Sequence, residues 1–235
     1  MINELLLIGS VIFIYGAVLL AYKFFGKTGL YCVSAIATVL ANIEVVILIN
    51  AFGMEQTLGN VLFAATFLVT DILSECEGKK EAGKAVWLGV FSSLFFLVLS
   101  QSWIAYIPAD SDTIHGAVSQ VFSNTPRMII ASLVVYAVSQ LFDVWLYHKW
   151  WAFTEKRFGD KRRFLWLRNN GSTLISQILN TLLFTLFAFW GTYDTKTMFS
   201  IFLSSYVIYI VTSLLDTPVV YLARSIKDKK QITDK

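Results

Sequence analysis

Long apolar runs separated by short polar connections make up most of this chain. Seven runs have the length of a membrane-spanning helix, which needs roughly 17 to 25 mostly apolar residues. They cover residues 4–24, 30–52, 58–75, 84–107, 126–148, 172–193 and 197–223. If two neighbouring runs merge into one hairpin, six crossings result. The pattern therefore predicts an all-α integral membrane protein, a helical bundle of six or seven transmembrane helices in a single domain, residues 1–235.

Composition supports a membrane protein over a soluble one. Hydrophobic residues make up 56% of the chain, charged residues only 15%, and the mean hydropathy is +0.64, values outside the range of soluble domains. Glu4 precedes the first apolar run and no small-residue cleavage pattern follows it, so we expect this run to stay in the membrane. Cys32 and Cys76 match no metal or redox spacing, and the sequence predicts neither a metal site nor a cofactor.

Basic residues indicate which side of the membrane each connection faces. With seven spans, all Lys and Arg residues except Arg127 and Lys196 fall on the side of the C-terminus, 17 of the 19. Short loops rich in Lys and Arg stay in the cytoplasm. The pattern therefore predicts an external N-terminus and a cytoplasmic basic tail at residues 224–235. With six crossings the N-terminus would move inside.

Two connections show the periodicity of helices that lie on the membrane surface. The outer one covers residues 114–122, and the inner one, FTEKRFGDKRRFLWLR, covers residues 153–168. Because the inner connection carries six basic residues beside aromatic ones, we expect it to bind anionic headgroups, which makes membrane lipid a partner. A nucleic-acid role is disfavoured, since such a patch would meet headgroups first.

Polar side chains inside the spans are costly there and need an explanation. They fall in stripes at spacings of three and four residues, which places each stripe on one helix face. The assigned topology brings carboxylates and amides of the third, fifth, sixth and seventh runs to one level in the cytoplasmic third, which indicates a binding site. These residues are Asp71, Glu75, Asp143, Gln177, Asn180 and Asp216. Ordinary hydrogen bonds between helices are the alternative. The stripes are Thr38 and Asn42; Thr66, Thr70 and Ser74 beside Asp71 and Glu75; Tyr136, Gln140, Asp143 and Tyr147; and Thr173, Ser176, Gln177 and Asn180.

The segment LRNNGSTLISQILNT, residues 167–181, enters the sixth run with several hydrogen-bonding side chains. Ser172 or Thr173 is a candidate helix N-cap after the flexible Gly171. The first-turn N–H groups beside Arg168 would then suit a polar or anionic ligand group. Amides donate and accept while carboxylates only accept. Together they suit a flat heterocycle with mixed edges, stacked on an aromatic ring.

Three blocks resemble the queuosine precursor transporters, also called the vitamin uptake transporter family. These are TDILSECEGKKEA (70–82), ASLVVYAVSQLFDVWLYH (131–148) and LRNNGSTLISQILNT (167–181). The resemblance implies uptake of a 7-deazaguanine precursor of queuosine, preQ0 or preQ1, through the cell inner membrane. The sequence leaves the free base queuine open as a further candidate. It also implies a substrate site, to which the polar stripes add Asn42. The residues it implies are Asp71, Glu75, Gln140, Asp143, Arg168, Asn169, Asn170, Ser172, Thr173, Gln177 and Asn180.

The resemblance also suggests roles for individual residues at that site. Glu75, Asp143 or Asp71 would bind the N–H edge of the base. Asn170 and Gln177 would meet its carbonyl group. A tyrosine or phenylalanine would stack on the ring.

Several alternatives stay open at this point. The chain has no phosphate-binding loop of the GxxxxGK[ST] type, so it does not itself hydrolyse ATP. Proton symport, facilitated diffusion and an ATPase partner all fit, the last making the chain a substrate-binding subunit of an ATP-driven complex. An intramembrane enzyme is disfavoured because no nucleophile with its partner is recognisable, and no residue is assigned as catalytic. A non-transporting subunit and a homodimer are further alternatives.

Overall fold

The predicted all-α membrane fold is confirmed. A computed structural model describes residues 1–123, 126–191 and 193–233, and among them are seven helices and one two-stranded hairpin. Six of the helices are long and apolar enough to cross a membrane. The elements are α1 (Ile2–Glu44), β1 (Leu48–Ala51), β2 (Met54–Thr57), α2 (Gly59–Cys76), α3 (Lys79–Ala105), α4 (His115–Phe122), α5 (Pro126–Phe158), α6 (Leu165–Phe189) and α7 (Thr195–Thr233).

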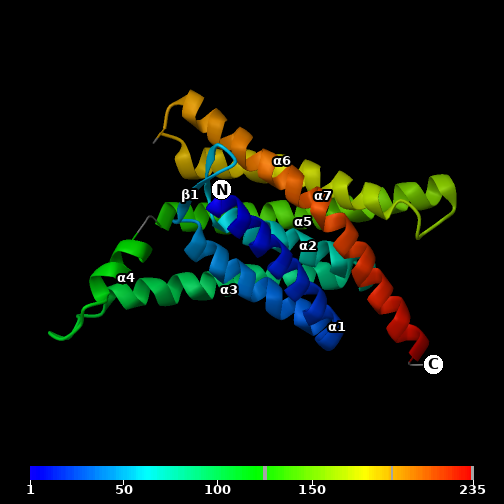
Figure 1. The fold of residues 1–235 in the computed structure, drawn as a ribbon, viewed down its shortest axis with the longest axis horizontal. Helices are drawn as coiled ribbons and strands as arrows, with labels where there is room; N and C mark the ends of the chain where they lie inside the picture. Colours follow the sequence, from blue (N-terminus) through cyan, green and yellow to red (C-terminus); the bar gives the residue numbers. More distant parts are fainter. Residues whose placement is uncertain (124–125, 192, 234–235) are drawn as a thin grey trace.

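Helix α1 folds back on itself and contains the first two predicted spans. At 1.5 Å per residue its 43 residues would extend about 65 Å, twice the thickness of a bilayer core. Gly26 interrupts it with φ 60° and ψ −144°, a conformation open to glycine. The second arm runs back from this turn toward the end that carries the N-terminus (Figure 1), where Asn3 Nδ2 donates to Asn50 O of β1 at 2.9 Å. The six helices therefore supply seven apolar arms.

The second predicted span, residues 30–52, is wrong in its C-terminal part. The helix ends at Glu44, and the following residues form β1, which pairs antiparallel with β2 in the register Leu48↔Thr57 to Ala51↔Met54. Phe52 and Gly53 connect the strands with φ values of 54° and 74°. Positive φ at both positions matches a two-residue hairpin turn. The β-branched residues before this turn favour a strand, although their hydropathy resembles that of a span.

Helix α2 is the central helix of the bundle. It matches the short predicted span 58–75 closely, and 15 of its 18 residues are buried. Helices α1, α3, α5 and α7 all pack against it. A central position explains its polar residues, because protein rather than lipid surrounds them.

The predicted inner surface helix at residues 153–168 is wrong. Helix α5 continues ten residues beyond its predicted end at 148, and α6 begins at Leu165 rather than near 172. Phe164, with φ 63°, precedes α6. Only residues 159–164 remain as the connection. Ser172 therefore lies inside α6, where its hydroxyl donates to Asn169 O at 3.1 Å, so the predicted N-cap and its free N–H groups are also wrong.

The helix predicted in the outer connection is present as α4, and the predicted tail turns out to be helical. Helix α7 continues through Thr233, so residues 224–233 extend the last span rather than forming a separate segment. Residues 234 and 235 of the predicted tail lie outside the described part. A proline, Pro218, lies inside this helix.

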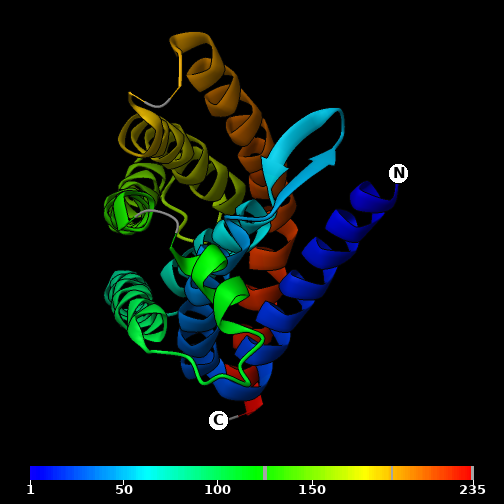
Figure 2. The same ribbon diagram turned by 90° about the vertical axis from the view of Figure 1, so that its left-hand side faces the viewer.

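The basic stretches gather at one end of the bundle. This end holds the turn of α1, the α2–α3 connection, the α5–α6 loop and the end of α7 (Figures 1 and 2). Ion pairs join these parts, with Lys27 bound to Glu81 at 3.3 Å and Lys227 to Glu77 at 3.2 Å. The opposite end carries the N-terminus, the β-hairpin and the α6–α7 connection. We call these the basic end and the hairpin end.

Candidate functional site

The predicted polar residues occupy three successive levels along the bundle rather than one. Along α6, Arg168 and Asn180 are twelve residues apart, about 18 Å at the helical rise. The first level is an ion-pair network near the basic end. The second is a group of buried aspartates, and the third is a cavity toward the hairpin end.

The ion-pair network consists of Glu75, Tyr147, Arg168 and Arg224, from α2, α5, α6 and α7. Both oxygens of Glu75 are bound: Arg168 Nη2 donates to Oε1 at 2.6 Å, and Arg168 Nε donates to Oε2 at 2.8 Å. Tyr147 OH adds a bond to Oε2 at 2.7 Å, and Arg224 Nη1 one to Oε1 at 3.2 Å. Such forked charge-assisted bonds are strong and geometrically specific.

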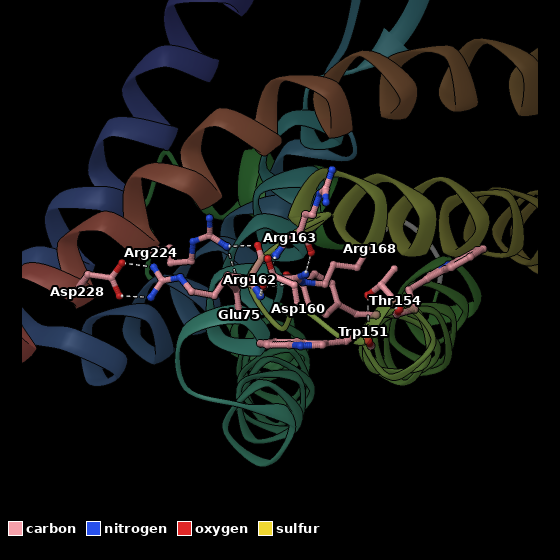
Figure 3. Close-up of polar contacts among 11 residues, drawn as sticks. Glu75, Trp151, Thr154, Asp160, Arg162, Arg163, Arg168, Arg224 and Asp228 are labelled. Atoms are coloured by element: carbon pink, nitrogen blue, oxygen red, sulfur yellow. Dashed lines mark hydrogen bonds and ion pairs between the residues drawn. The ribbon is translucent and has the colours of Figure 1, made fainter. Parts of the chain in front are cut away.

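Arg168 is fully buried, so its hydrogen bonds to Glu75 replace the water that its guanidinium group lacks. Its guanidinium lies 4.3 Å from the ring centroid of Trp151, a cation–π contact, and its Nη1 donates to Arg163 O at 2.9 Å (Figure 3). Arg224 Nη1 similarly donates to Arg162 O at 2.9 Å. The α5–α6 loop therefore closes over the network.

The aspartate cluster consists of Asp71, Asp143 and Asp216, on α2, α5 and α7. All three are buried, with exposures of 0%, 0% and 1%. Thr173 donates to Asp71 Oδ2 at 3.0 Å and Ser176 to Asp143 Oδ1 at 2.7 Å, so α6 hydroxyls hold both carboxyl groups. The structure thus brings together Asp71, Asp143 and Thr173 as predicted.

Three of the predicted amides make contacts between helices. Asn169 and Asn170 both donate to Thr217 Oγ1 on α7, at 3.3 and 2.7 Å, and Ser213 donates to Asn170 Oδ1 at 3.2 Å. Gln140 on α5 bonds two α2 hydroxyls, accepting from Thr70 at 3.0 Å and donating to Thr66 at 2.6 Å. These amides cross-link α6 with α7 and α2 with α5.

The cavity lies one to two turns beyond the aspartates, toward the hairpin end, and has a volume of about 120 Å³. A single water needs roughly 10–15 Å³ on this measure. Five aromatic residues line it, and three of them are neighbours: Phe63 lies 6.0 Å from both Tyr136 and Tyr209, measured between ring centroids. Neutral polar side chains complete the wall, and its described lining has no carboxylate and no basic group. They include Asn42, Asn60, Asn180, Thr181 and Thr185.

Only Asn42 and Asn180 of the twelve predicted site residues line this cavity. Asn42 links three helices, donating to Thr38 O at 2.8 Å and to Ser93 at 3.2 Å and accepting from Ser132 at 3.3 Å. Asn180 Nδ2 donates to Gln177 Oε1 at 3.2 Å, which connects the cavity with the aspartate level. The two amides thus line the hollow from two different helices, α1 and α6.

Sequence reasoning missed Asn60 and the aromatic walls Phe63 and Tyr209. Asn60 Oδ1 accepts from Tyr209 OH at 3.2 Å, across a separation of 149 residues. One signal was available, because Asn60, Phe63 and Phe67 share one face of the predicted third span. The phenylalanines were indistinguishable there from ordinary core residues.

Comparison with known proteins places the chain in a family. The family model described as "putative vitamin uptake transporter" matches residues 57–223, more than half of the chain. The chain is 41% identical to the "probable queuosine precursor transporter" of Bacillus subtilis over 207 residues, 88% of each protein. It is 27% identical to the "queuosine precursor transporter" of Escherichia coli over 155 residues, 62% of this chain and 61% of the relative. No solved structure matches it.

These matches agree with six candidate membrane helices around a polar interior. A transporter acts on a small molecule and leaves it unchanged. The chain therefore belongs to the vitamin uptake transporter family, as a multi-pass membrane protein that is not an enzyme.

Proposed function

We propose that this chain imports a 7-deazaguanine precursor of queuosine, preQ0 or preQ1, across the cell inner membrane. The relatives' names supply the substrate class. The observation that carries the proposal is the cavity, with aromatic walls and neutral amides. A fused heterocyclic base has flat apolar faces and edges that both donate and accept. Stacking of a base on an aromatic side chain contributes about 1–3 kcal/mol, and amides match mixed edges.

In this proposal the base first binds in the cavity between Phe63, Tyr136 and Tyr209. Asn42 and Asn180 meet its edges from α1 and α6. The base then passes to the aspartate level, where Asp71 or Asp143 binds its N–H edge. Gln140 and Gln177 line this passage. The roles predicted for these residues from the sequence thus become successive contacts of the substrate on its way through the bundle.

The remaining predicted residues belong to the closed end of that path. Glu75 and Arg168 satisfy each other fully in this conformation. They meet the substrate only when α2 and α6 separate, as alternating access requires. Asn169, Asn170, Ser172 and Thr173 then line the opening near the basic end. We assign this end, with the C-terminus, to the cytoplasm, because basic connections stay on that side.

Binding of preQ0, preQ1 and queuine to detergent-purified protein, measured by calorimetry, tests the substrate. Two α3 glycines test the cavity. An added Cβ at Gly89 would lie 2.2 Å from Tyr136 OH, whereas one at Gly83 meets nothing within 4 Å. Gly89→Ala displaces a cavity wall and should weaken binding about tenfold, equivalent to about 1.4 kcal/mol. Gly83→Ala should bind as the wild type does.

A second variant covers the case in which Gly89→Ala fails to fold. Phe63→Leu removes an aromatic face and should weaken binding by about 1–3 kcal/mol. Wild-type affinity in both variants would exclude the cavity as the binding site. Uptake of unchanged, labelled base by vesicles containing only this chain would support a transporter that works alone. Binding without uptake would support a subunit of an ATP-driven complex.

A further inference from the structure

The carboxyl groups of the aspartate cluster carry more negative charge than the groups around them neutralise. The carboxyl groups of Asp71 and Asp143 lie within hydrogen-bonding reach of each other, and Asp216 is close enough for its charge to act on both. No ion pair within the described residues reaches any of the three. The nearest buried cation, Arg168, is engaged by Glu75. Three acidic groups therefore share one buried site, and no basic side chain that the structure describes forms an ion pair with them.

Each aspartate also has an oxygen that receives no hydrogen bond from the part of the chain that the structure describes. These atoms are Asp71 Oδ1, Asp143 Oδ2 and Asp216 Oδ1. Ser139, four residues before Asp143 on the same helix face, is fully buried and its hydroxyl is likewise without a partner. Unsatisfied buried polar atoms are rare and costly. Their concentration around one pair of carboxyl groups indicates a missing ligand.

The charge and the size of the site favour a proton as that ligand. Like charges at contact distance in a low-dielectric site repel strongly, and two carboxyl groups in this situation retain one proton between them. Protonation also creates the O–H donor that the free oxygens lack. A metal ion is disfavoured, because no group of three or more His, Cys, Asp or Glu residues is arranged to bind one among the residues described.

The groups around the cluster do not replace the proton. From α1, the Tyr15 hydroxyl lies near Asp216, but it donates to Thr212 O at 3.4 Å. From α5, Tyr147 faces Asp71, but its hydroxyl donates to Glu75. From α6, the contacts are the hydroxyls of Thr173 and Ser176. Neutral hydroxyl groups stabilise a carboxylate, but they do not cancel three negative charges.

We propose that Asp71, Asp143 and Asp216 form a proton-binding site, and that one proton enters and leaves it together with each substrate molecule. The site lies between the cavity and the ion-pair network, so a substrate that passes from one to the other passes the site. The proton binds a free Asp71 or Asp143 oxygen from the hairpin end and leaves toward the basic end. The substrate itself is chemically unchanged. The coupling, though not the proton site, rests on the proposed transport function.

Infrared spectroscopy of the purified protein tests the proton site without any substrate. At neutral pH the wild type should show the C=O stretch of a protonated carboxyl group, shifted in heavy water. Asp143→Asn should remove or weaken this band, and Asp216→Asn should change it. Asp112→Asn alters only an exposed loop acid and should leave it unchanged. A wild type without the band, or a band unaffected in both cluster variants, would overturn the proton site.

Proteoliposomes test the coupling with labelled preQ0, which is neutral. With the interior one pH unit more alkaline, one coupled proton should drive accumulation up to about tenfold, and substrate addition should alkalinise the exterior. Asp216→Asn, a cluster residue outside the proposed substrate contacts, should weaken the effect of the gradient but retain exchange of labelled for unlabelled preQ0. Wild-type exchange without any response to the gradient would refute the coupling. Absence of exchange would instead refute the transport function, while the infrared result stands.

Discussion

Glu75 and Asp71 are buried acids one helical turn apart on α2, and their surroundings hold them in opposite ways. Glu75 is 2% exposed and receives four hydrogen bonds, three of them from arginine side chains. Asp71 is fully buried, lies beside two further carboxyl groups and receives a single bond from Thr173. The first acid has a full set of positive partners, and the second has none within the described residues.

This difference separates an acid that holds the helices together from acids that bind and release a ligand. A buried ion pair is costly to break, because the remaining charge has no water to stabilise it. The network of Glu75, Tyr147, Arg168 and Arg224 therefore holds four helices together at the basic end. The unpaired aspartates have no such bond to lose and are free to exchange a ligand. The burial of the side chains does not distinguish the two cases, whereas their hydrogen-bond and ion-pair partners do.

Glu75→Gln should give the largest loss of stability. Gln keeps the shape of the side chain but removes its charge, which leaves Arg168 buried without a counter-ion. Breaking a buried pair in this way costs about 3–5 kcal/mol. The thermal unfolding midpoint of detergent-purified protein measures the effect. Glu155→Gln removes an exposed ion pair with Lys161 and serves as the control, with almost no expected change. Equal midpoints for both variants would show that the network does not hold the bundle.

Arg168→Lys should give an intermediate loss. Lysine keeps the charge but cannot bind both Glu75 oxygens in a fork, and it loses the planar contact with the Trp151 ring. One lost hydrogen bond to a charged group costs about 1.5–3 kcal/mol. Arg157→Lys, on the exposed end of α5, is the matched control. A variant as stable as the wild type would mean that only the charge matters here.

Asp71→Asn should behave in the opposite way to Glu75→Gln. It removes one of three unpaired acids, and the Asn oxygen still accepts from Thr173. We expect the free energy of unfolding to stay unchanged or to rise by about 1 kcal/mol, as when other uncompensated buried charges are removed. Thermal unfolding of both variants in one buffer compares the signs directly. A loss comparable to that of Glu75→Gln would show that Asp71 has a positive partner after all.

The sequence predicted the helices well where hydropathy alone sets their extent. Residues 58–75 matched α2 within one residue at each end. It failed where polar residues extend a helix beyond the membrane, as at Phe158 and Leu165, because hydropathy does not record helical propensity in water. It also failed at Leu48, where β-branched apolar residues form a strand. Apolar composition indicates burial or lipid contact, but it does not choose between strand and helix.

The sequence predicted which polar residues are buried, but not how they are grouped. Helical spacing correctly indicated that Asp71 and Asp143 face the interior. It gave no means of seeing that Glu75 pairs with Arg168, because that contact joins residues 93 positions apart. The cavity was missed for a related reason. Its aromatic residues come from α2, α5, α6 and α7, and only the packed bundle brings them together.

Asp160→Ala should produce the smallest effect, because this residue acts on the network only through the loop. Asp160 Oδ1 accepts from the backbone N–H groups of Arg162 at 2.7 Å and Arg163 at 3.2 Å. These bonds hold the pKa of Asp160 below its usual range. The carbonyl groups of the same two residues accept from Arg224 and Arg168. Alanine should therefore loosen the loop and increase hydrogen exchange in residues 159–168, with a smaller shift in the unfolding midpoint than Arg168→Lys gives.

The pH dependence of that effect has a definite sign. Because the folded-state pKa of Asp160 is lowered, its contribution is complete above the unfolded-state pKa, about 3.9, and disappears as the pH falls through the folded-state value. The wild type and Asp160→Ala should therefore exchange at different rates at pH 7 and at similar rates in strong acid. Asp194→Ala removes an equivalent turn at the hairpin end and should leave residues 159–168 unaffected. Faster exchange there in Asp194→Ala would mean that the two ends of the bundle are coupled, and that Glu75 and Arg168 respond to more than their own loop.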